Sequence, residues 1–130
     1  MYTNKLLLSD VFGSIHSENS SSVHLVEHST LTLRCSSSTD DQIRWHYIAP
    51  DSKTDTVIYN GERLNKALGD RYSVKVSEFD RSSQLTVCDV QCEDAGVWKC
   101  FEMQSIANSL SFVVIVFAAT GNHQYLKTVN

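Results

Sequence analysis

The sequence predicts an all-β fold, a two-sheet antiparallel sandwich, and three observations support this prediction. Short segments of alternating apolar and polar residues recur about every 8 to 12 residues, with Ser, Asp, Asn and Gly between them. No stretch keeps a helical period for three turns. The 130 residues suffice for one two-layer core, and four cysteines can supply cross-links.

The expected strands follow this alternation and end where turn-forming residues gather. A stretch rich in Ser and Asn at residues 17–22 predicts a loop that breaks the first strand from its continuation. We expect strands at residues 23–26, 30–35, 42–48, 56–59, 72–76, 83–87, 96–103 and 110–117.

Charge and hydropathy exclude two classes of partner. The net charge is -4, from 15 carboxylates against 11 Lys and Arg, and no basic cluster could neutralise a phosphate backbone. The longest apolar run, at residues 112–120, has about half the length of a membrane-spanning helix. We therefore expect no nucleic-acid partner and no membrane insertion.

The cysteines predict two disulfides. Cys35 and Cys100 each lie in an alternating pattern, so that both point inward and can pair between the sheets. Cys88 and Cys92 flank a short turn and are expected to form a second, local bridge. Two alternatives stay open, a zinc site, which Cys35 is too remote to complete, and a free thiol or a link to another chain.

Several motifs together resemble immunoglobulin V-set domains over about residues 21–118. They are Leu-Thr-Leu-Arg-Cys ending at Cys35, Ile-Arg-Trp ending at Trp45, and Asp-Ala-Gly-Val-Trp-Lys-Cys at 94–100. The resemblance implies Greek-key connections and a Trp45 side chain packed on the Cys35 bridge. It also implies a salt bridge from Arg71 to Asp94 and an additional edge strand at about 62–64. Residues 1–20 are then a partly flexible segment and candidate first strand, and residues 119–130 a tail or linker.

Two features depart from the V-set pattern. Trp98 stands where a corner tyrosine is usual, and an indole N–H donates but cannot accept a hydrogen bond. The last strand lacks the Phe-Gly-x-Gly element of paired antigen-receptor domains. The resemblance therefore gives little support to pairing of the antibody type.

The leading functional prediction is an extracellular receptor or adhesion domain that binds a protein partner, or a second copy of itself, through its front sheet. If Trp45 and Cys100 point inward, alternation turns their neighbours outward. The last strand is apolar on both faces, which favours a contact surface. The predicted contact residues are Arg44, His46, Ile48, Lys99, Phe101 and Phe112.

The alternative prediction is a secreted innate recognition module that binds carbohydrate or a microbial surface through its end loops. Residues 36–41, 59–64 and 103–108 are expected to cluster at one end. Asp40, Asp41, Tyr59 and Arg63 are the candidate contacts. Asn19 begins a glycosylation sequon, which favours an extracellular location.

Neither catalysis nor cofactor binding is expected. The serines and five histidines show no spacing typical of a nucleophile with its base. The adjacent Asp40 and Asp41 lack the alternating acidic pattern of a calcium loop, so no metal site is predicted.

Overall fold

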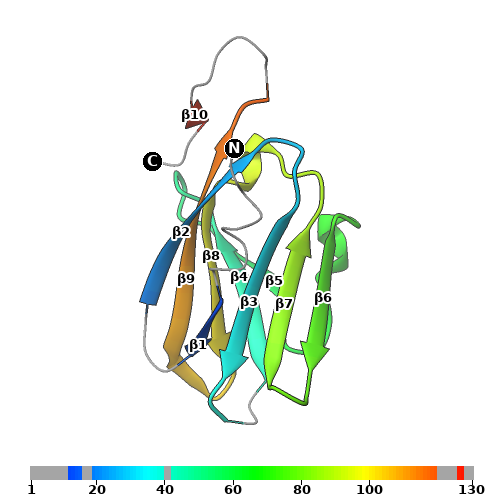
Figure 1. Cartoon of the computed structure of the whole chain (residues 1–130), viewed down its shortest axis with the longest axis vertical. Coiled ribbons are helices and arrows are strands. Elements are labelled where there is room, and N and C mark those ends of the chain that lie inside the picture. Colours follow the sequence, from blue (N-terminus) through cyan, green and yellow to red (C-terminus); the bar gives the residue numbers. More distant parts are fainter. Residues whose placement is uncertain (1–11, 16–18, 40–41, 120–125, 128–130) are drawn as a thin grey trace.

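The computed structural model describes residues 12–15, 19–39, 42–119 and 126–127, which form two packed sheets (Figure 1). The strands alternate buried and less buried side chains, as in β3, because successive residues point to opposite faces. The strands are β1 Phe12–Ile15, β2 Asn19–Val26, β3 Leu31–Ser37, β4 Ile43–Ile48, β5 Asp55–Tyr59, β6 Tyr72–Ser77, β7 Ser82–Val87, β8 Gly96–Glu102, β9 Ser105–Phe117 and β10 Leu126–Lys127. Two short 3-10 helices, η1 Lys66–Leu68 and η2 Cys92–Asp94, lie in connections.

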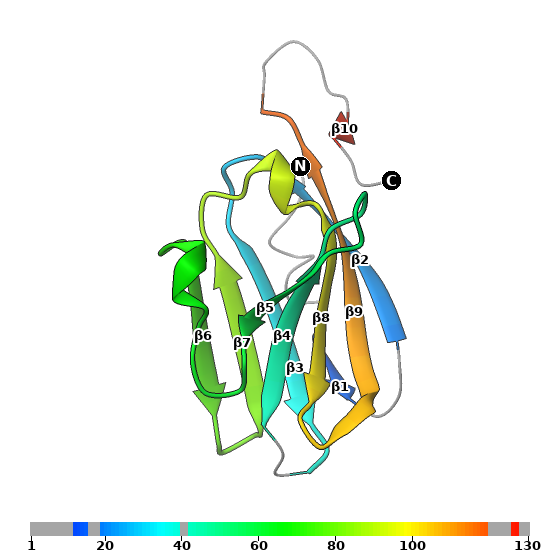
Figure 2. The same cartoon turned by 180° about the vertical axis from the view of Figure 1, so that it is seen from behind.

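The back sheet has the order β1-β3-β7-β6, and the front sheet has the order β10-β9-β8-β4-β5 with β2 also paired to β9. Figure 2 views the molecule from the side of the front sheet. The pairings are antiparallel except for β1 with β3 and β2 with β9, which are parallel. The N-terminal part of the chain therefore contributes one strand to each sheet.

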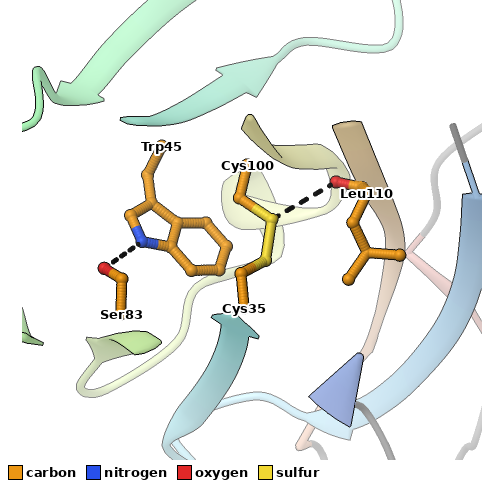
Figure 3. The surroundings of a disulfide bond; sticks show 5 residues. All are labelled: Cys35, Trp45, Ser83, Cys100 and Leu110. Carbon is orange, nitrogen blue, oxygen red and sulfur yellow. Dashed lines mark hydrogen bonds between the residues drawn. A yellow bond between two sulfur atoms is a disulfide. The ribbon is translucent and has the colours of Figure 1, made fainter. Parts of the chain in front are cut away.

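The core lies between the sheets and is centred on one disulfide. Cys35 of β3 is bonded to Cys100 of β8, and both residues are fully buried (Figure 3). The Trp45 ring lies beside this bond, and its Nε1–H donates to Ser83 Oγ at 2.9 Å. The carbonyl oxygen of Leu110 lies 3.7 Å from Cys100 Sγ, a contact without a shared proton because a disulfide sulfur carries none.

A largely buried ion pair closes the end of the sandwich opposite the β6–β7 turn. Arg71 donates from Nη1 to Asp94 Oδ2 at 2.9 Å and from Nη2 to Oδ1 at 3.1 Å, so the predicted pair is present and bidentate. Asp94 Oδ2 also accepts from the Gln91 backbone at 2.7 Å. The Trp98 indole, which is 1% exposed, donates to the Asp94 carbonyl at 2.9 Å. The Trp98 N–H therefore makes the hydrogen bond to the backbone that a tyrosine hydroxyl usually makes at this corner.

Four expectations about the strands were wrong in detail. Residues 62–64 form no strand, because the chain turns at Asn60 and Gly61 and only a single bridge joins Tyr59 to Leu64. The predicted loop at 17–22 is in part strand, since Asn19 to Ser22 pair along the edge of β9. The end loop expected at residues 103–108 is only Met103 and Gln104, because β9 begins at Ser105. The sequence patterns also did not predict β10, whose Leu126 pairs with Phe117.

Gly96 occupies a position that no other residue can fill without displacement. Its φ is +152°, and a Cβ there would lie 2.7 Å from Tyr47 Cε1 and 2.9 Å from the Ile48 carbonyl oxygen. The Tyr47 hydroxyl donates to the Ala95 carbonyl at 2.6 Å, and burial raises the pKa of Tyr47 to about 12, so the donor keeps its proton.

We expect Gly96→Ala to lower the free energy of unfolding by about 2 kcal/mol, through backbone strain and displacement of the Tyr47 ring. Urea unfolding followed by tryptophan fluorescence measures this change in the free energy of unfolding. Gly69→Ala is the matched control, because Gly69 also has a positive φ, +93°, but a Cβ added there would meet no atom within 4 Å. Equal losses in both variants would show that the packing against Tyr47 contributes nothing.

Candidate functional site

The first candidate site is the outer face of the front sheet, which we define as the side of β4, β8 and β9 that points away from the disulfide. Trp45 and Cys100 are buried and pair directly with each other, so the residues beside them in both strands turn outward. The structure accordingly places five of the six predicted contact residues here and leaves each partly exposed: Arg44, His46, Ile48, Lys99 and Phe101.

Phe101 is the centre of a compact cluster on the outer face. The ring of His46 lies 4.8 Å from the Phe101 ring, centroid to centroid, and the Arg44 guanidinium carbon lies 6.0 Å from the same centroid. His46 Nδ1 lies 2.7 Å from Asp55 Oδ1 of the neighbouring strand β5. A guanidinium and an imidazole are therefore held against an aromatic ring, an arrangement that favours contact with protein side chains.

Two polar atoms of this cluster lack partners within the described part of the chain. Arg44 Nε and His46 Nε2 are buried, and neither has a hydrogen bond. A buried polar atom without a partner costs about 1–3 kcal/mol. Arg44 Nε and His46 Nε2 are therefore the polar atoms of the cluster whose hydrogen bonds remain to be supplied by water or a neighbouring group.

The prediction for Phe112 was wrong. Phe112 is fully buried and its ring stacks on Trp45 at 6.1 Å, centroid to centroid. The reason is the register, because Phe112 pairs with Trp98, which faces the core. The outward side chains of β9 are instead Val113 and Ile115, which the sequence patterns did not single out.

The second candidate site lies at the end of the sandwich where the β6–β7 and β8–β9 turns gather, at the bottom of Figure 1. A pocket of about 680 Å³ opens here between the ends of β4 and β5 on one side and those of β6 and β7 on the other. We call it the end pocket. Of the predicted loop contacts, Tyr59 lines it, Arg63 is exposed in the adjacent turn, and Asp40 and Asp41 lie outside the described residues.

The predicted bridge between Cys88 and Cys92 is absent. Cys88 is exposed, and the Cys92 thiol donates to Glu27 Oε2 at 3.3 Å. In the turn between them Asp89 has a φ of +51°, and η2 begins at Cys92. Val90 between them is fully buried in the core.

Asn19 lies at the first position of β2, and not in a loop as expected. Within the described residues no group of three or more His, Cys, Asp or Glu is placed to hold a metal ion. A search of the same part of the chain for a helix long and apolar enough to span a membrane finds none.

Comparison with known proteins identifies the family. The family model described as "Immunoglobulin V-set domain" matches residues 18–113, well over half of the chain. The chain belongs to the immunoglobulin V-set family. This V-set domain is 28% identical over 88 residues to the rabbit (Oryctolagus cuniculus) Ig kappa chain V region 3368, covering 66% of the chain and 78% of the relative.

A solved structure supports the fold of the V-set domain. The first Ig domain of the mouse polymeric immunoglobulin receptor superposes with a TM-score of 0.63 at 15% sequence identity, covering 76% of the chain and 91% of that domain. The residues matched by the family model include both bonded cysteines and the paired Arg71 and Asp94. The family is consistent with an immune-type recognition role.

Proposed function

We propose that this V-set domain is an extracellular recognition module of an immune-type or adhesion receptor, and not an enzyme, and that it binds a protein partner through the outer face of the front sheet. The Phe101 cluster is the observation that carries the proposal, because it joins an aromatic ring, a guanidinium and an imidazole on one partly exposed surface. Aromatic residues and Arg are enriched at the centres of protein interfaces.

The apolar part of the same face extends the proposed contact surface. Val97, Val113 and Ile115 point outward on neighbouring strands and are partly exposed. An antiparallel sheet with a solvated face normally carries polar residues at such positions. A second copy of the chain is the first candidate partner, since an apolar face with mixed charges can be self-complementary.

Two further features support an extracellular location. The Cys35–Cys100 disulfide is of a kind that persists in oxidising compartments. Asn19, Ser20 and Ser21 form a glycosylation sequon at the edge of the sandwich, with Ser20 and Ser21 exposed. We propose that Asn19 carries a glycan.

The proposal is tested by the mass of the purified domain against concentration, measured by analytical ultracentrifugation. We expect a monomer–dimer equilibrium whose dissociation constant rises about tenfold or more in Phe101→Ser, because removal of a central aromatic anchor costs about 2 kcal/mol.

Phe79→Ser is the matched control, because Phe79 is 98% exposed on the β6–β7 turn, away from the outer face. A monomer at every concentration would exclude self-association. Equal weakening by both substitutions would exclude the outer face as the contact surface.

A further inference from the structure

The two sheets end on one side of the sandwich in β5 and β6, and the free edge of β5 is occupied by the chain itself. Asn65 donates from its backbone N–H to the Ile58 carbonyl at 2.9 Å and from Nδ2 to the Val57 carbonyl at 2.9 Å. An isolated bridge also joins Tyr59 to Leu64. The connection that leaves β5 therefore covers the edge of the front sheet.

The free edge of β6 has no such cover within the part of the chain that the structure describes. β6 pairs with β7 alone and is the last strand of the back sheet (Figure 1). No backbone hydrogen bond joins it to the preceding connection, residues 60–71. An open strand edge of this kind presents unpaired backbone groups to which a strand of another chain can bond.

The backbone groups at this edge are identified by one hydrogen bond at the start of β6. The Cys88 N–H donates to the Arg71 carbonyl at 2.9 Å, and the pairing of β6 with β7 continues from there without a shift in register. The N–H and C=O of one residue point to the same side of an antiparallel strand, and the side alternates along the chain. The backbone groups of Tyr72, Val74 and Val76 therefore point away from β7, toward the open edge.

The side chains at this edge give it little protection. Val74 and Val76 lie on the side that faces the other sheet, because they pair with Leu85 and Ser83, and Val76 is 54% exposed. Lys75 is the one charged residue of β6, and its exposed side chain lies on the opposite side of the strand. Folded proteins usually protect an exposed apolar edge with charged residues, so this edge is suited to contact with another strand.

A second copy of β6 fits the edge in antiparallel orientation, about a two-fold axis at Val74. Val74 then pairs with Val74 of the second copy, and Tyr72 pairs with Val76 in both directions. All of these residues point their backbone groups toward the edge, so the pairs would exchange about six backbone hydrogen bonds. The edge is therefore complementary to itself.

Charge selects this register over its neighbours. With the axis at Val74, Lys75 lies opposite Ser73 of the second copy. An axis at Lys75 would place the two copies of Lys75 directly opposite each other, and an axis at Ser73 would place Lys75 opposite Arg71. Like charges directly opposite each other destabilise a strand pair.

We propose that the domain associates with a second copy of itself through the β6 edge, which joins two back sheets into one continuous sheet. Addition of a strand to an exposed edge is a general mode of recognition, and a two-fold contact closes with two copies. The β6 edge is separate from the outer face of the front sheet, so this inference goes beyond the proposed function and does not depend on it. Copies that use both contacts would form an extended row.

The test is sedimentation equilibrium of the Phe101→Ser domain, in which the outer face is weakened. We expect a monomer–dimer equilibrium with a Kd of about 0.5 mM. Ser73→Glu should lower this Kd about fivefold and Ser73→Lys should raise it about fivefold, because residue 73 lies opposite Lys75 on both sides of the axis. The Ser73 side chain is exposed, so neither change disturbs the core.

Two further measurements examine the backbone contact itself. Val74→Pro removes an N–H that points to the open edge and leaves the bonds to β7 intact, so the Kd should rise at least tenfold. Amide hydrogen exchange should show stronger protection of Tyr72, Val74 and Val76 at concentrations above the Kd than below it.

The matched controls are Thr30→Glu and Thr30→Lys, which make the same charge changes at an exposed position in the β2–β3 turn and should leave the Kd unchanged. The inference is overturned if the Phe101→Ser domain stays monomeric well above the expected Kd. It is also overturned if the Ser73 and Thr30 variants behave alike, or if the three amides gain no protection. Failure of the proposed function is a different result, an equal Kd in the parent and in Phe101→Ser.

Discussion

Replacing Cys35 and Cys100 together by alanine should lower the free energy of unfolding by about 4 kcal/mol. The bond joins residues 65 apart in sequence, so its loss releases a long closed loop in the unfolded chain. Both cysteines are fully buried, and Trp45 lies beside the bond, so the variant also loses packing in the core. A domain of this size has a total stability of about 5–15 kcal/mol, so a large share of it is removed.

Urea unfolding with and without the substitutions measures the effect, and the Trp45 environment gives a fluorescence signal. Cys88→Ser is the control, because Cys88 is exposed and outside the disulfide, and its change should stay within about 0.5 kcal/mol. A loss under about 1 kcal/mol in the double variant would show that the disulfide contributes little to the stability of the domain.

Asp94→Ala should lower the free energy of unfolding by about 3 kcal/mol. The substitution leaves Arg71 without its bidentate partner and the Gln91 N–H without an acceptor. The Asp94 side chain is 8% exposed, so water cannot easily replace it, although the Arg71 side chain, 30% exposed, can recover some hydration. The penalty is therefore that of breaking one side of a mostly buried pair.

Asp80→Ala is the matched comparison for this prediction. Asp80 also pairs with an arginine, Arg34, at 2.7 Å, but the two side chains are 42% and 41% exposed. An exposed pair contributes little to stability, because water screens both charges. Thermal or urea unfolding of the two variants should therefore give clearly different losses, and similar losses would show that burial of Asp94 adds nothing.

Most of the fold could be predicted because burial repeats every second residue in the sequence. Leu31, Leu33 and Cys35 are all fully buried, and this alternation located β3 and the inward direction of its cysteine. The same reasoning failed at Phe112, since β9 is apolar on both faces and alternation within the strand does not say which face is inside. Only the pairing with Trp98 decides it.

The sites were harder to predict, because they depend on residues far apart in the chain. Tyr59 and Ser83 meet in the end pocket only because the edges of two sheets lie next to each other. Asp55 joins the outer face through the contact of its side chain with His46, although the register of β4 with β5 places Asp55 opposite Ile48. The positive φ of Asp89, in the turn between Cys88 and Cys92, leaves no clear signal in the sequence.

The parallel pairing of β2 with β9 has a mechanical consequence. The two strands are in register over eight residue pairs, from Asn19 with Leu110 to Val26 with Phe117. Tension applied at Asn19 and at Phe117 would pull these parallel strands in opposite directions along their length. Their backbone hydrogen bonds would then be sheared together, whereas tension across a hairpin opens such bonds one after another. The pairing thus resists stretching along the line that joins the start of β2 to the end of β9.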